Sequence, residues 1–325
     1  MTHFADRLTA ACRAKGNALC VGLDPRWEAL PRDLRTRHDD GTLAGVAHAV
    51  EEFSLRVIDL VTPLVPVVKP QAAFFEMCGP LGMLALQRVL RRAKERGLLT
   101  ILDGKRNDIA STAAAYADAA FAGVTIDGTT HPVWDADALT VNPYLGRDAV
   151  EPFLQSARRS GRGVFLLVRT SNPGARQFQD LDCGGKPLFL HVAEAVRSWA
   201  REGLGECGLG DAGAVVGATY PAELAELRRA MPEVPFLVPG YGAQGGSAAD
   251  VAGAFRPDGC GAVVNSSRGI TCAFRPDDPN WEEVVVAATK AAIADLVRHT
   301  PMAALSAQEK KTAPSDDSRR PSRPT

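Results

Sequence analysis

The sequence predicts an α/β protein of the (β/α)8 class, the TIM barrel, in which eight parallel strands alternate with helices and close into a ring. Three observations indicate this fold. Eight short apolar runs recur along the chain, and each precedes a longer segment with helical spacing. The runs are continuously apolar, as in parallel strands that are buried on both faces. Polar residues follow nearly every run, so they would gather at one end of a barrel.

The expected strands are taken from these apolar runs. They lie at 18–24, 64–75, 98–105, 138–146, 163–174, 212–221, 234–246 and 261–270. An open, doubly wound sheet would also alternate strands with helices. However, the first run is not followed by the GxGxxG pattern that opens many such sheets. We therefore favour the closed barrel.

The segments between the runs include stretches with helical spacing. The clearest are 81–97, 222–231 and 281–299. Two connections, 25–63 and 172–211, are longer than one loop and one helix require. We expect these two connections to hold extra helices that help to cover the mouth of the barrel.

The end of the chain differs in composition from the rest. Residues 1–299 carry the strand and helix pattern and are expected to form a single catalytic domain. Residues 300–325 are rich in proline, serine and charge and lack apolar periodicity. Such a segment cannot bury enough apolar surface to offset the entropy of ordering, so we expect a disordered tail.

The bulk composition excludes several classes of protein. The 325 residues are 46% hydrophobic and 23% charged, with a formal net charge of -1. This balance does not favour binding to nucleic acid or to an anionic membrane. Seven cysteines without a CxxC pair indicate reduced thiols. The N-terminus lacks the apolar segment of a signal peptide, and no run has the roughly 20 apolar residues of a membrane helix. We expect a cytoplasmic protein.

Charged residues end the first three expected strands. They are Asp24, Lys69, Asp103 and Lys105. Asp103 and Lys105 are two positions apart, so they share one face of a strand. Taken singly, these residues could be a turn aspartate, a surface lysine and a structural ion pair, and Asp108 could cap the next helix. Together they would converge on one side of one mouth, where opposite charges keep one another ionised. We interpret this set as a site.

The last two expected strands end in residues suited to an anion. PGYGAQGG (239–246) follows the seventh, and NSSRGI (265–270) ends the eighth. Loops at these positions commonly bind phosphate in this fold. Glycines let backbone N–H groups approach an anion, a helix N-terminus adds positive charge, and Arg268 can add two hydrogen bonds. The sequence therefore predicts a phosphorylated ligand.

Other catalytic patterns are missing from the sequence. There is no His and Cys cluster with metal-ligand spacing, no GxSxG motif and no Ser-His-Asp set. An acid or base at the expected site would therefore be a lysine or a carboxylate.

Residues 1–299 resemble the orotidine 5′-phosphate decarboxylase family, in its longer bacterial, type 2 subgroup. DGKRNDIAST (103–112) matches the family signature D-x-K-R-x-D-I-x-x-T. VKPQAAFFE, RTSNPG, GYGAQGG and SSRGI match in the expected order. Asn107 stands where glycine is more usual in the family. We expect its side chain to form a hydrogen bond in the turn before Asp108.

The resemblance implies that the protein converts orotidine 5′-phosphate (OMP) to UMP and CO2 in de novo pyrimidine biosynthesis, without a metal or an organic cofactor. It implies a network of Lys69, Asp103, Lys105 and Asp108, in which Lys105 stabilises and protonates the C6 carbanion. It also implies a homodimer in which Asp108 and Thr112 reach into the neighbouring site.

The resemblance further implies contacts to each part of the substrate. The implied substrate-binding residues are Asp24, Thr112, Ser171, Gln244 and Arg268. Asp24 and Lys69, with the partner's Thr112 and Asp108, would bind the ribose hydroxyls. Gln244 and Arg268 would hold the phosphate. Ser171 would contact the pyrimidine edge, with Thr170 and Asn172 as alternatives.

Two other functions fit parts of the pattern. Magnesium-dependent hexulose phosphate synthases and keto-gulonate-phosphate decarboxylases resemble the chain at D-x-K-x-x-D, but they need a carboxylate from the second strand, where this chain has Lys69. A catalytically silent barrel that only binds a nucleotide or phosphosugar would be expected to lose part of the Asp and Lys set. All four members are present.

Overall fold

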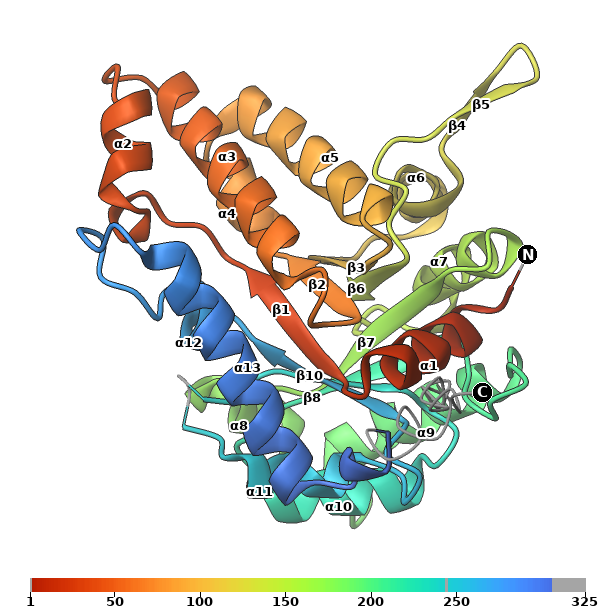
Figure 1. Cartoon of the computed structure of the whole chain (residues 1–325). Helices are drawn as coiled ribbons and strands as arrows, with labels where there is room; N and C mark the ends of the chain where they lie inside the picture. The colour runs from red at the N-terminus through yellow and green to blue at the C-terminus, as the bar shows by residue number, and fades with distance from the viewer. Residues whose placement is uncertain (1, 243–244, 306–325) are drawn as a thin grey trace, which may run out of the picture.

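A closed ring of eight parallel strands lies at the centre of the protein. The computed structural model describes residues 2–242 and 245–305. The strands follow one another around the ring in chain order, and the last pairs with the first. They are β1 (Leu19–Leu23), β2 (Val67–Pro70), β3 (Leu99–Arg106), β6 (Ala138–Val141), β7 (Gly163–Arg169), β8 (Ala212–Val216), β9 (Phe236–Val238) and β10 (Ala262–Ser266). This arrangement confirms the predicted barrel (Figure 1).

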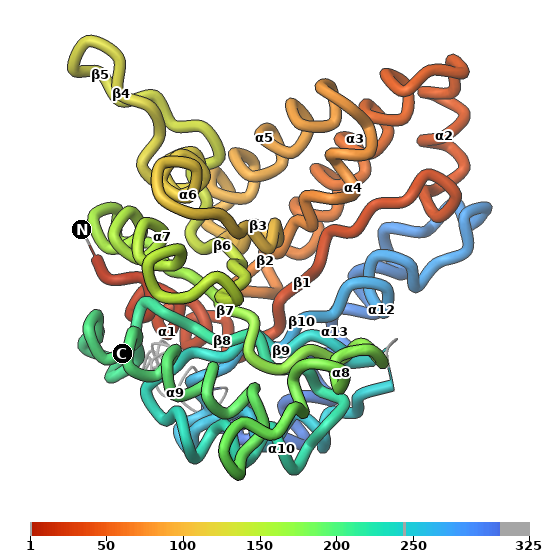
Figure 2. Tube along the Cα trace, turned by 180° about the vertical axis from the view of Figure 1, so that it is seen from behind, coloured from red at the N-terminus to blue at the C-terminus, as the bar shows by residue number. Residues whose placement is uncertain are grey.

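Helices surround the ring (Figures 1 and 2). The longer ones are α1 (Phe4–Lys15), α2 (Arg32–His38), α3 (Leu43–Val61), α5 (Gly79–Glu95), α6 (Ala110–Ala117), α7 (Arg147–Arg159), α9 (Leu188–Arg201), α10 (Pro221–Ala230) and α13 (Trp281–His299). Short helices are α4 (Ala72–Glu76), α8 (Arg176–Gln179), α11 (Ala248–Val251) and α12 (Arg268–Thr271). Single turns are η1 (Trp27–Ala29), η2 (Asp118–Ala122), η3 (Pro173–Ala175) and η4 (Ala252–Ala254). The two long connections hold the expected extra helices, α2 and α8.

The outer helices pack through apolar stripes that the sequence dictates. In α5, buried residues recur every three or four positions, including Ala85, Leu86, Val89, Leu90 and Ala93. This spacing places them on one face of the helix, toward the barrel. The strands are buried along nearly their whole length. A helical layer around an apolar ring therefore holds the strand ends in fixed positions.

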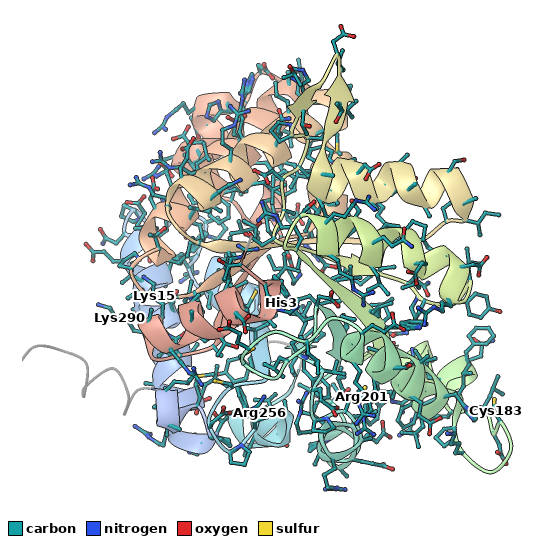
Figure 3. All side chains as sticks on the ribbon, turned by 90° about the vertical axis from the view of Figure 1, so that its right-hand side faces the viewer. His3, Lys15, Cys183, Arg201, Arg256 and Lys290 are labelled. Atoms are coloured by element: carbon teal, nitrogen blue, oxygen red, sulfur yellow. The ribbon has the colours of Figure 1, made fainter. Side chains whose placement is uncertain are left out.

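Helix α1 closes the barrel at the start of the strands. His3, labelled in Figure 3, lies just before this helix. It caps the helix, because its Nδ1 accepts a hydrogen bond from Ala5 N at 3.2 Å. Phe4 lies edge-on to Phe165 of β7, with ring centroids 6.0 Å apart. Gly163 makes room for the Phe4 ring, since a Cβ at this position would lie 2.2 Å from it. The closed end leaves the opposite mouth for a site.

The C-terminal boundary differs from the expected one. Met302 and Leu305 are fully buried, and Met302 Sδ lies 3.4 Å from Ala18 N, just before β1. Residues 300–305 are therefore packed against the barrel, and the prediction of a tail from residue 300 was wrong for these six. Residues 306–325 lie outside the described residues.

A two-stranded hairpin projects beside α6 (Figure 1). Strands β4 (Val124–Ile126) and β5 (Thr129–His131) pair antiparallel and are exposed throughout. Asp127 and Gly128 both have positive φ, 49° and 79°, as a tight two-residue turn requires. The Asp-Gly dipeptide is a strong hairpin signal that the sequence reading missed.

Candidate active site

Asp103 lies at the centre of a charged network in the mouth of the barrel. It is 5% exposed, near the end of β3. Lys69 Nζ lies 2.6 Å from its Oδ2, and Lys105 Nζ lies 2.7 Å from its Oδ1. The sequence-based expectation that these three side chains meet is confirmed. The carboxylate is held between two ammonium groups.

The environment fixes the charges of Asp103 and Lys69. Burial alone would raise the pKa of Asp103, but Lys69 and Lys105 lower that pKa far below its usual range. Burial likewise opposes the charge of Lys69, yet Asp103 and Asp24 raise the pKa of this lysine above its ordinary value. Lys69 is 4% exposed, so it is not a surface lysine. Both groups stay ionised in the neutral range.

The backbone of β3 is distorted where it presents Lys105. The pairing of β3 with β6 shifts register between Leu102 and Arg106, and Lys105 has a φ of 44°. A left-handed conformation in a residue other than glycine costs on the order of 1 kcal/mol. The Lys105 side chain is 45% exposed, whereas that of Asp103 is 7% exposed. The distortion therefore places a solvent-accessible ammonium above a buried carboxylate.

Two further residues hold Asp103 in place, and the sequence reading missed both. Thr140 Oγ1 of β6 donates a hydrogen bond to Asp103 Oδ1 at 2.9 Å and accepts one from Lys105 N at 2.9 Å. Gln71 Nε2 donates to Asp103 Oδ2 at 3.0 Å. The signal for Gln71 was its position, two residues after Lys69 and therefore on the same side of the chain. Four donors thus orient one carboxylate.

Asp24 follows β1 and leaves one oxygen ready to accept a hydrogen bond. Its Oδ1 is buried and has no hydrogen-bond partner. The same is true of Oδ1 of Asn265, on the neighbouring strand β10. Gly22 lets the Ser267 loop approach β1 closely, because a Cβ on this glycine would lie 1.9 Å from Ser267 Oγ. Buried acceptors without partners are costly unless a bound molecule satisfies them.

Asp108 and Thr112 make no hydrogen bond or ion pair with the charged network of their own chain among the described residues. Asp108 Oδ1 accepts a hydrogen bond from Ile109 N at 2.8 Å, and no ion pair of Asp108 is found among the described residues. The N-cap of α6 is Ile109, without a side-chain cap, so the capping interpretation of Asp108 was wrong. Thr112 is exposed on α6. Asn107 Oδ1 is buried without a hydrogen-bond partner, and the side-chain hydrogen bond expected of Asn107 in the turn is not found among the described residues.

The glycine-rich loop lies across the ring from β3. It follows β9, which is four strands from β3 in the closed order. Gly240, Gly242 and Gly245 have φ values of 101°, 76° and 96°, conformations that favour glycine. Tyr241 OH donates to Asp295 Oδ2 at 2.8 Å and so ties this loop to α13. Gln244, one of the expected phosphate ligands, lies outside the described residues.

A pocket opens between this loop and the end of β10. Its walls include Gly242, Gly246, Ser266 and Gly269. Arg268, the other expected phosphate ligand, is exposed at the start of α12, next to Gly269. Backbone N–H groups on glycines and an adjacent guanidinium are suited to an anion. A hollow therefore lies beside the two segments expected to bind a phosphate, and α13 forms its other wall.

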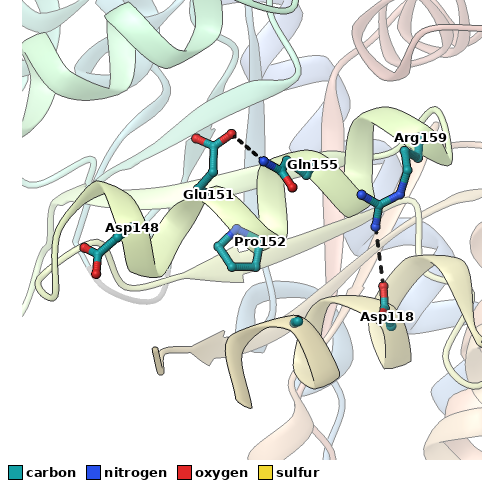
Figure 4. A pocket seen from close by; sticks show the side chains of 7 residues that line it. Asp118, Asp148, Glu151, Pro152, Gln155 and Arg159 are labelled. Atoms are coloured by element: carbon teal, nitrogen blue, oxygen red, sulfur yellow. Dashed lines mark hydrogen bonds and ion pairs between the residues drawn. The ribbon is translucent and has the colours of Figure 1, made fainter. Parts of the chain in front are cut away.

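The rest of the described structure offers no metal centre. Among residues 2–242 and 245–305, no group of three or more His, Cys, Asp or Glu side chains could hold a metal ion. Another pocket lies in the outer layer between α7 and the η2 region, lined by Asp118, Glu151 and Arg159 among others (Figure 4). It contains no lysine. No helix within the described part of the chain is long and apolar enough to cross a membrane.

Fold and site together define a barrel enzyme whose candidate reacting groups are lysines and carboxylates, with a glycine-rich loop across the mouth. Residues 17–278 match the orotidine 5′-phosphate decarboxylase / HUMPS family. The chain therefore belongs to this family.

Individual relatives agree with the family match. An orotidine 5′-phosphate decarboxylase from Rhodopirellula baltica is 50% identical over 296 residues, which cover 89% of this chain and 97% of the relative. One from Deinococcus radiodurans is 41% identical over 268 residues, covering 82% and 88%. The structure of Leishmania donovani OMP decarboxylase superposes with a TM-score of 0.71 at 34% identity, covering 92% of this chain and 99% of that one.

Proposed function

We propose that the chain decarboxylates OMP with the Lys69, Asp103 and Lys105 network as its reacting centre and without a metal or an organic cofactor. The family and its named relatives make it a carboxy-lyase of pyrimidine biosynthesis. The observation that carries the mechanism is the buried Asp103 carboxylate, held between two ammonium groups at 2.6 and 2.7 Å.

The reaction explains why a fixed ammonium is needed. Breaking the bond between C6 and the carboxylate releases CO2 and leaves an electron pair in the plane of the ring, where the π system cannot delocalise it. A positioned cation stabilises this charge because it is oriented before the reaction starts. Lys105 Nζ then gives its proton to C6, forming UMP. Lys105 is partly exposed, so the neutral amine can take a proton back from water.

Asp103 sets the position and the charge of Lys105. Four donors hold the carboxylate, so it cannot turn away when substrate enters. We place it beside the substrate carboxylate, where repulsion between the two would be relieved when CO2 leaves. This repulsion is a secondary contribution. The main contribution comes from the oriented ammonium groups.

The remaining contacts follow the geometry of the mouth. Asp24, with its unpaired buried oxygen, and Lys69 would bind ribose hydroxyls. Arg268, Gln244 and the glycine loop would hold the phosphate across the ring. Because the phosphate is remote from C6, its binding energy can orient the base without taking part in the bond change. Ser171 would contact the pyrimidine edge.

A magnesium-dependent reaction on a hexulose phosphate is the second candidate, since the matched family includes such enzymes by name. It needs a carboxylate at the end of β2. That position holds Lys69, whose ammonium is paired with Asp103 and cannot bind a metal while charged. The donor set therefore favours OMP.

We further propose a homodimer in which Asp108 and Thr112 complete the partner's site. Exposed apolar side chains flank these residues, since Ile109 is 54% and Tyr116 is 41% exposed. Exposed large apolar side chains beside polar site residues are consistent with an interface. All seven cysteines are free thiols, which supports the cytoplasm as the location.

Turnover measured by ultraviolet absorbance tests the reaction. Purified protein with EDTA present should consume OMP and form UMP at a rate independent of added magnesium. Hexulose 6-phosphate with magnesium should not react. Turnover of the hexulose phosphate, or loss of OMP turnover in EDTA, would contradict the proposal.

Mixed dimers test the shared site. Lys105→Ala and Asp108→Asn should each be inactive alone. In a heterodimer of the two, one site keeps both Lys105 and the partner's Asp108, and the other site keeps neither. Random mixing makes half of the dimers mixed, so about a quarter of wild-type activity should return. No recovery after confirmed subunit exchange would refute the shared site.

A further inference from the structure

The loop after β7 is tied down more firmly than its exposure suggests. It begins at Thr170 and passes through η3 and α8 before α9. Its residues around α8 are mostly exposed, and Phe178 is 59% exposed. Yet Arg169, the residue that ends β7, is 1% exposed and forms ion pairs with neighbouring segments.

Arg169 joins three segments around one buried guanidinium. Its Nη1 pairs with Asp180 at the end of α8, and its Nε donates to Glu223 Oε2 of α10 at 2.6 Å. The rings of Phe189 and Tyr220 lie 4.8 and 4.6 Å from the guanidinium carbon. A planar cation with carboxylates at its edge and aromatic rings at its faces is a rigid support.

The strand is also bulged at this point. Leu167 pairs with Val215 and Arg169 with Val216, so two steps on β7 match one step on β8. Bulges change the direction in which the following side chains point, and they are frequent beside active sites. The bulge and the buried guanidinium together fix the direction of the chain at Thr170 to Asn172.

A second set of contacts then sorts the three candidate residues. Thr170 Oγ1 donates to Asn172 Oδ1 at 2.7 Å and accepts from Gln179 Nε2 at 2.7 Å. Thr170 N donates to Gln179 Oε1 at 3.0 Å. The hydroxyl of Thr170 and the amide oxygen of Asn172 are therefore already engaged. Within the described residues, no hydrogen bond involves Ser171 Oγ.

Ser171 also lies where a ligand could reach it. Its backbone packs on Gly217, just past the end of β8, and a Cβ on this glycine would lie 2.9 Å from Ser171 Cβ. Gly217 N donates to Arg169 O at 2.8 Å, so the two strand ends are joined here. Ser171 is thus seated at the ends of two barrel strands, on the side of the mouth where the site opens.

We propose that Arg169, Gln179 and Asp180 form a clamp of positioning residues. Gln179 engages Thr170, the pair of Arg169 with Asp180 holds the loop, and the Ser171 hydroxyl stays available to read the edge of the pyrimidine. This rests on the proposed function, in which Ser171 contacts the pyrimidine edge, and it adds the residues that keep Ser171 in position for that contact. The clamp acts through Ser171 and does not itself touch the base. Its loss should weaken recognition of the base while leaving recognition of the ribose phosphate intact.

The test compares binding of UMP with binding of ribose 5-phosphate, which lacks the base, by calorimetry. Gln179→Ala frees Thr170, and Asp180→Asn removes the loop's ion pair with Arg169. Each should raise the Kd for UMP about fivefold, the loss expected for about one hydrogen bond, and leave the Kd for ribose 5-phosphate unchanged. Asp59→Asn is the matched control, because Asp59 pairs with Arg92 and Arg96 on the outer helices and should change neither.

A double-mutant cycle separates positioning from general destabilisation. In a Ser171→Ala background, Gln179→Ala should have no further effect on UMP binding, because its target is gone. Equal weakening of both ligands, or additive effects in the double variant, would overturn the clamp. Wild-type protein that binds no UMP would refute the proposed function. Tight wild-type binding that both clamp variants leave unchanged would refute this inference alone.

Discussion

Replacing Asp103 by asparagine separates the charge of the network from its shape. Asparagine is nearly the same size, but it removes the negative charge that lies between Lys69 and Lys105. Lys69 is 4% exposed, so water cannot replace the lost carboxylate. The variant therefore measures how much stability depends on the pairing.

The expected magnitude follows from the burial of Lys69. If the lysine loses its proton at pH 7, the cost is about 4.6 kcal/mol, from roughly 1.36 kcal/mol for each of about 3.4 pH units below its usual pKa. Asp24 remains nearby and favours the charged lysine, which reduces the cost. Breaking a buried pair costs about 3 to 5 kcal/mol, so we expect a loss near the lower value, about 3 kcal/mol.

The same variant has a defined pH dependence. The native pKa of Asp103 is lowered, so its stabilising contribution is complete above the unfolded value of about 3.9 and is lost as the pH falls through the folded pKa. The native pKa of Lys69 is raised, so its contribution persists below about pH 10.4 and is lost only as the pH rises through the folded value. The stability gap between wild type and Asp103→Asn should therefore shrink below about pH 4, where the carboxylate of the unfolded wild type takes up its proton.

Urea unfolding followed by circular dichroism gives the free energies, provided that the slope is the same for both proteins. Asp59→Asn controls for loss of a carboxylate in an exposed ion pair and should cost less than about 1 kcal/mol. A loss below 1 kcal/mol in Asp103→Asn, or a gap that persists unchanged at pH 3, would refute the electrostatic reasoning.

Two further substitutions test the packing around the site and at the closed end of the barrel. Gly22→Ala should lower kcat/KM for OMP about 100-fold with little change in Tm. The reason is that its Cβ would meet Ser267 Oγ at 1.9 Å and displace the loop that carries Arg268. A change in kcat/KM within threefold would show that the loop can move freely. Met302→Ala should lower the free energy of unfolding by about 2 to 4 kcal/mol without changing kcat. Met77→Ala, at a 67% exposed position, is the control and should have little effect on the free energy of unfolding. Equal effects of the two substitutions would contradict the packed C-terminus.

The strands and the charged centre could be predicted because each leaves a local pattern. Continuous apolar runs mark strands that are buried on both faces. Because Asp103 and Lys105 are two positions apart, we expected them to share a face of the strand. Their side chains contact each other as predicted. The backbone between Asp103 and Lys105 does not follow the regular alternation of a strand, since β3 is bulged and Lys105 has a positive φ. The sequence spacing identified Asp103 and Lys105 as partners, but it did not predict the strained backbone at Lys105.

Other contacts depend on which strands are neighbours in the barrel, and a local sequence pattern does not predict strand neighbours. Thr140 sits in ALTV, where threonine is an ordinary strand residue, and only the pairing of β3 with β6 brings it to Asp103. Met302 opens the apolar run MAAL (302–305), which is too short to show periodicity and directly precedes a polar segment, so its burial against Ala18 was missed. Helix α1 was also missed, although Phe4, Leu8 and Cys12 are spaced four apart and buried.

The most direct test of the central claim is to separate the chemical step from binding in Lys105→Ala. The measurement is kcat for OMP alongside the Kd for UMP, with Lys290→Ala as a control on the outer helix α13. We predict that Lys105→Ala loses at least about 10³-fold in kcat, as expected for removal of an oriented charge and a proton donor. The Kd for UMP should change by less than about threefold, since one solvated ammonium contributes little to product binding. Lys105→Ala protein that keeps more than about a tenth of wild-type kcat would contradict the assignment of Lys105 as the group that stabilises and protonates C6.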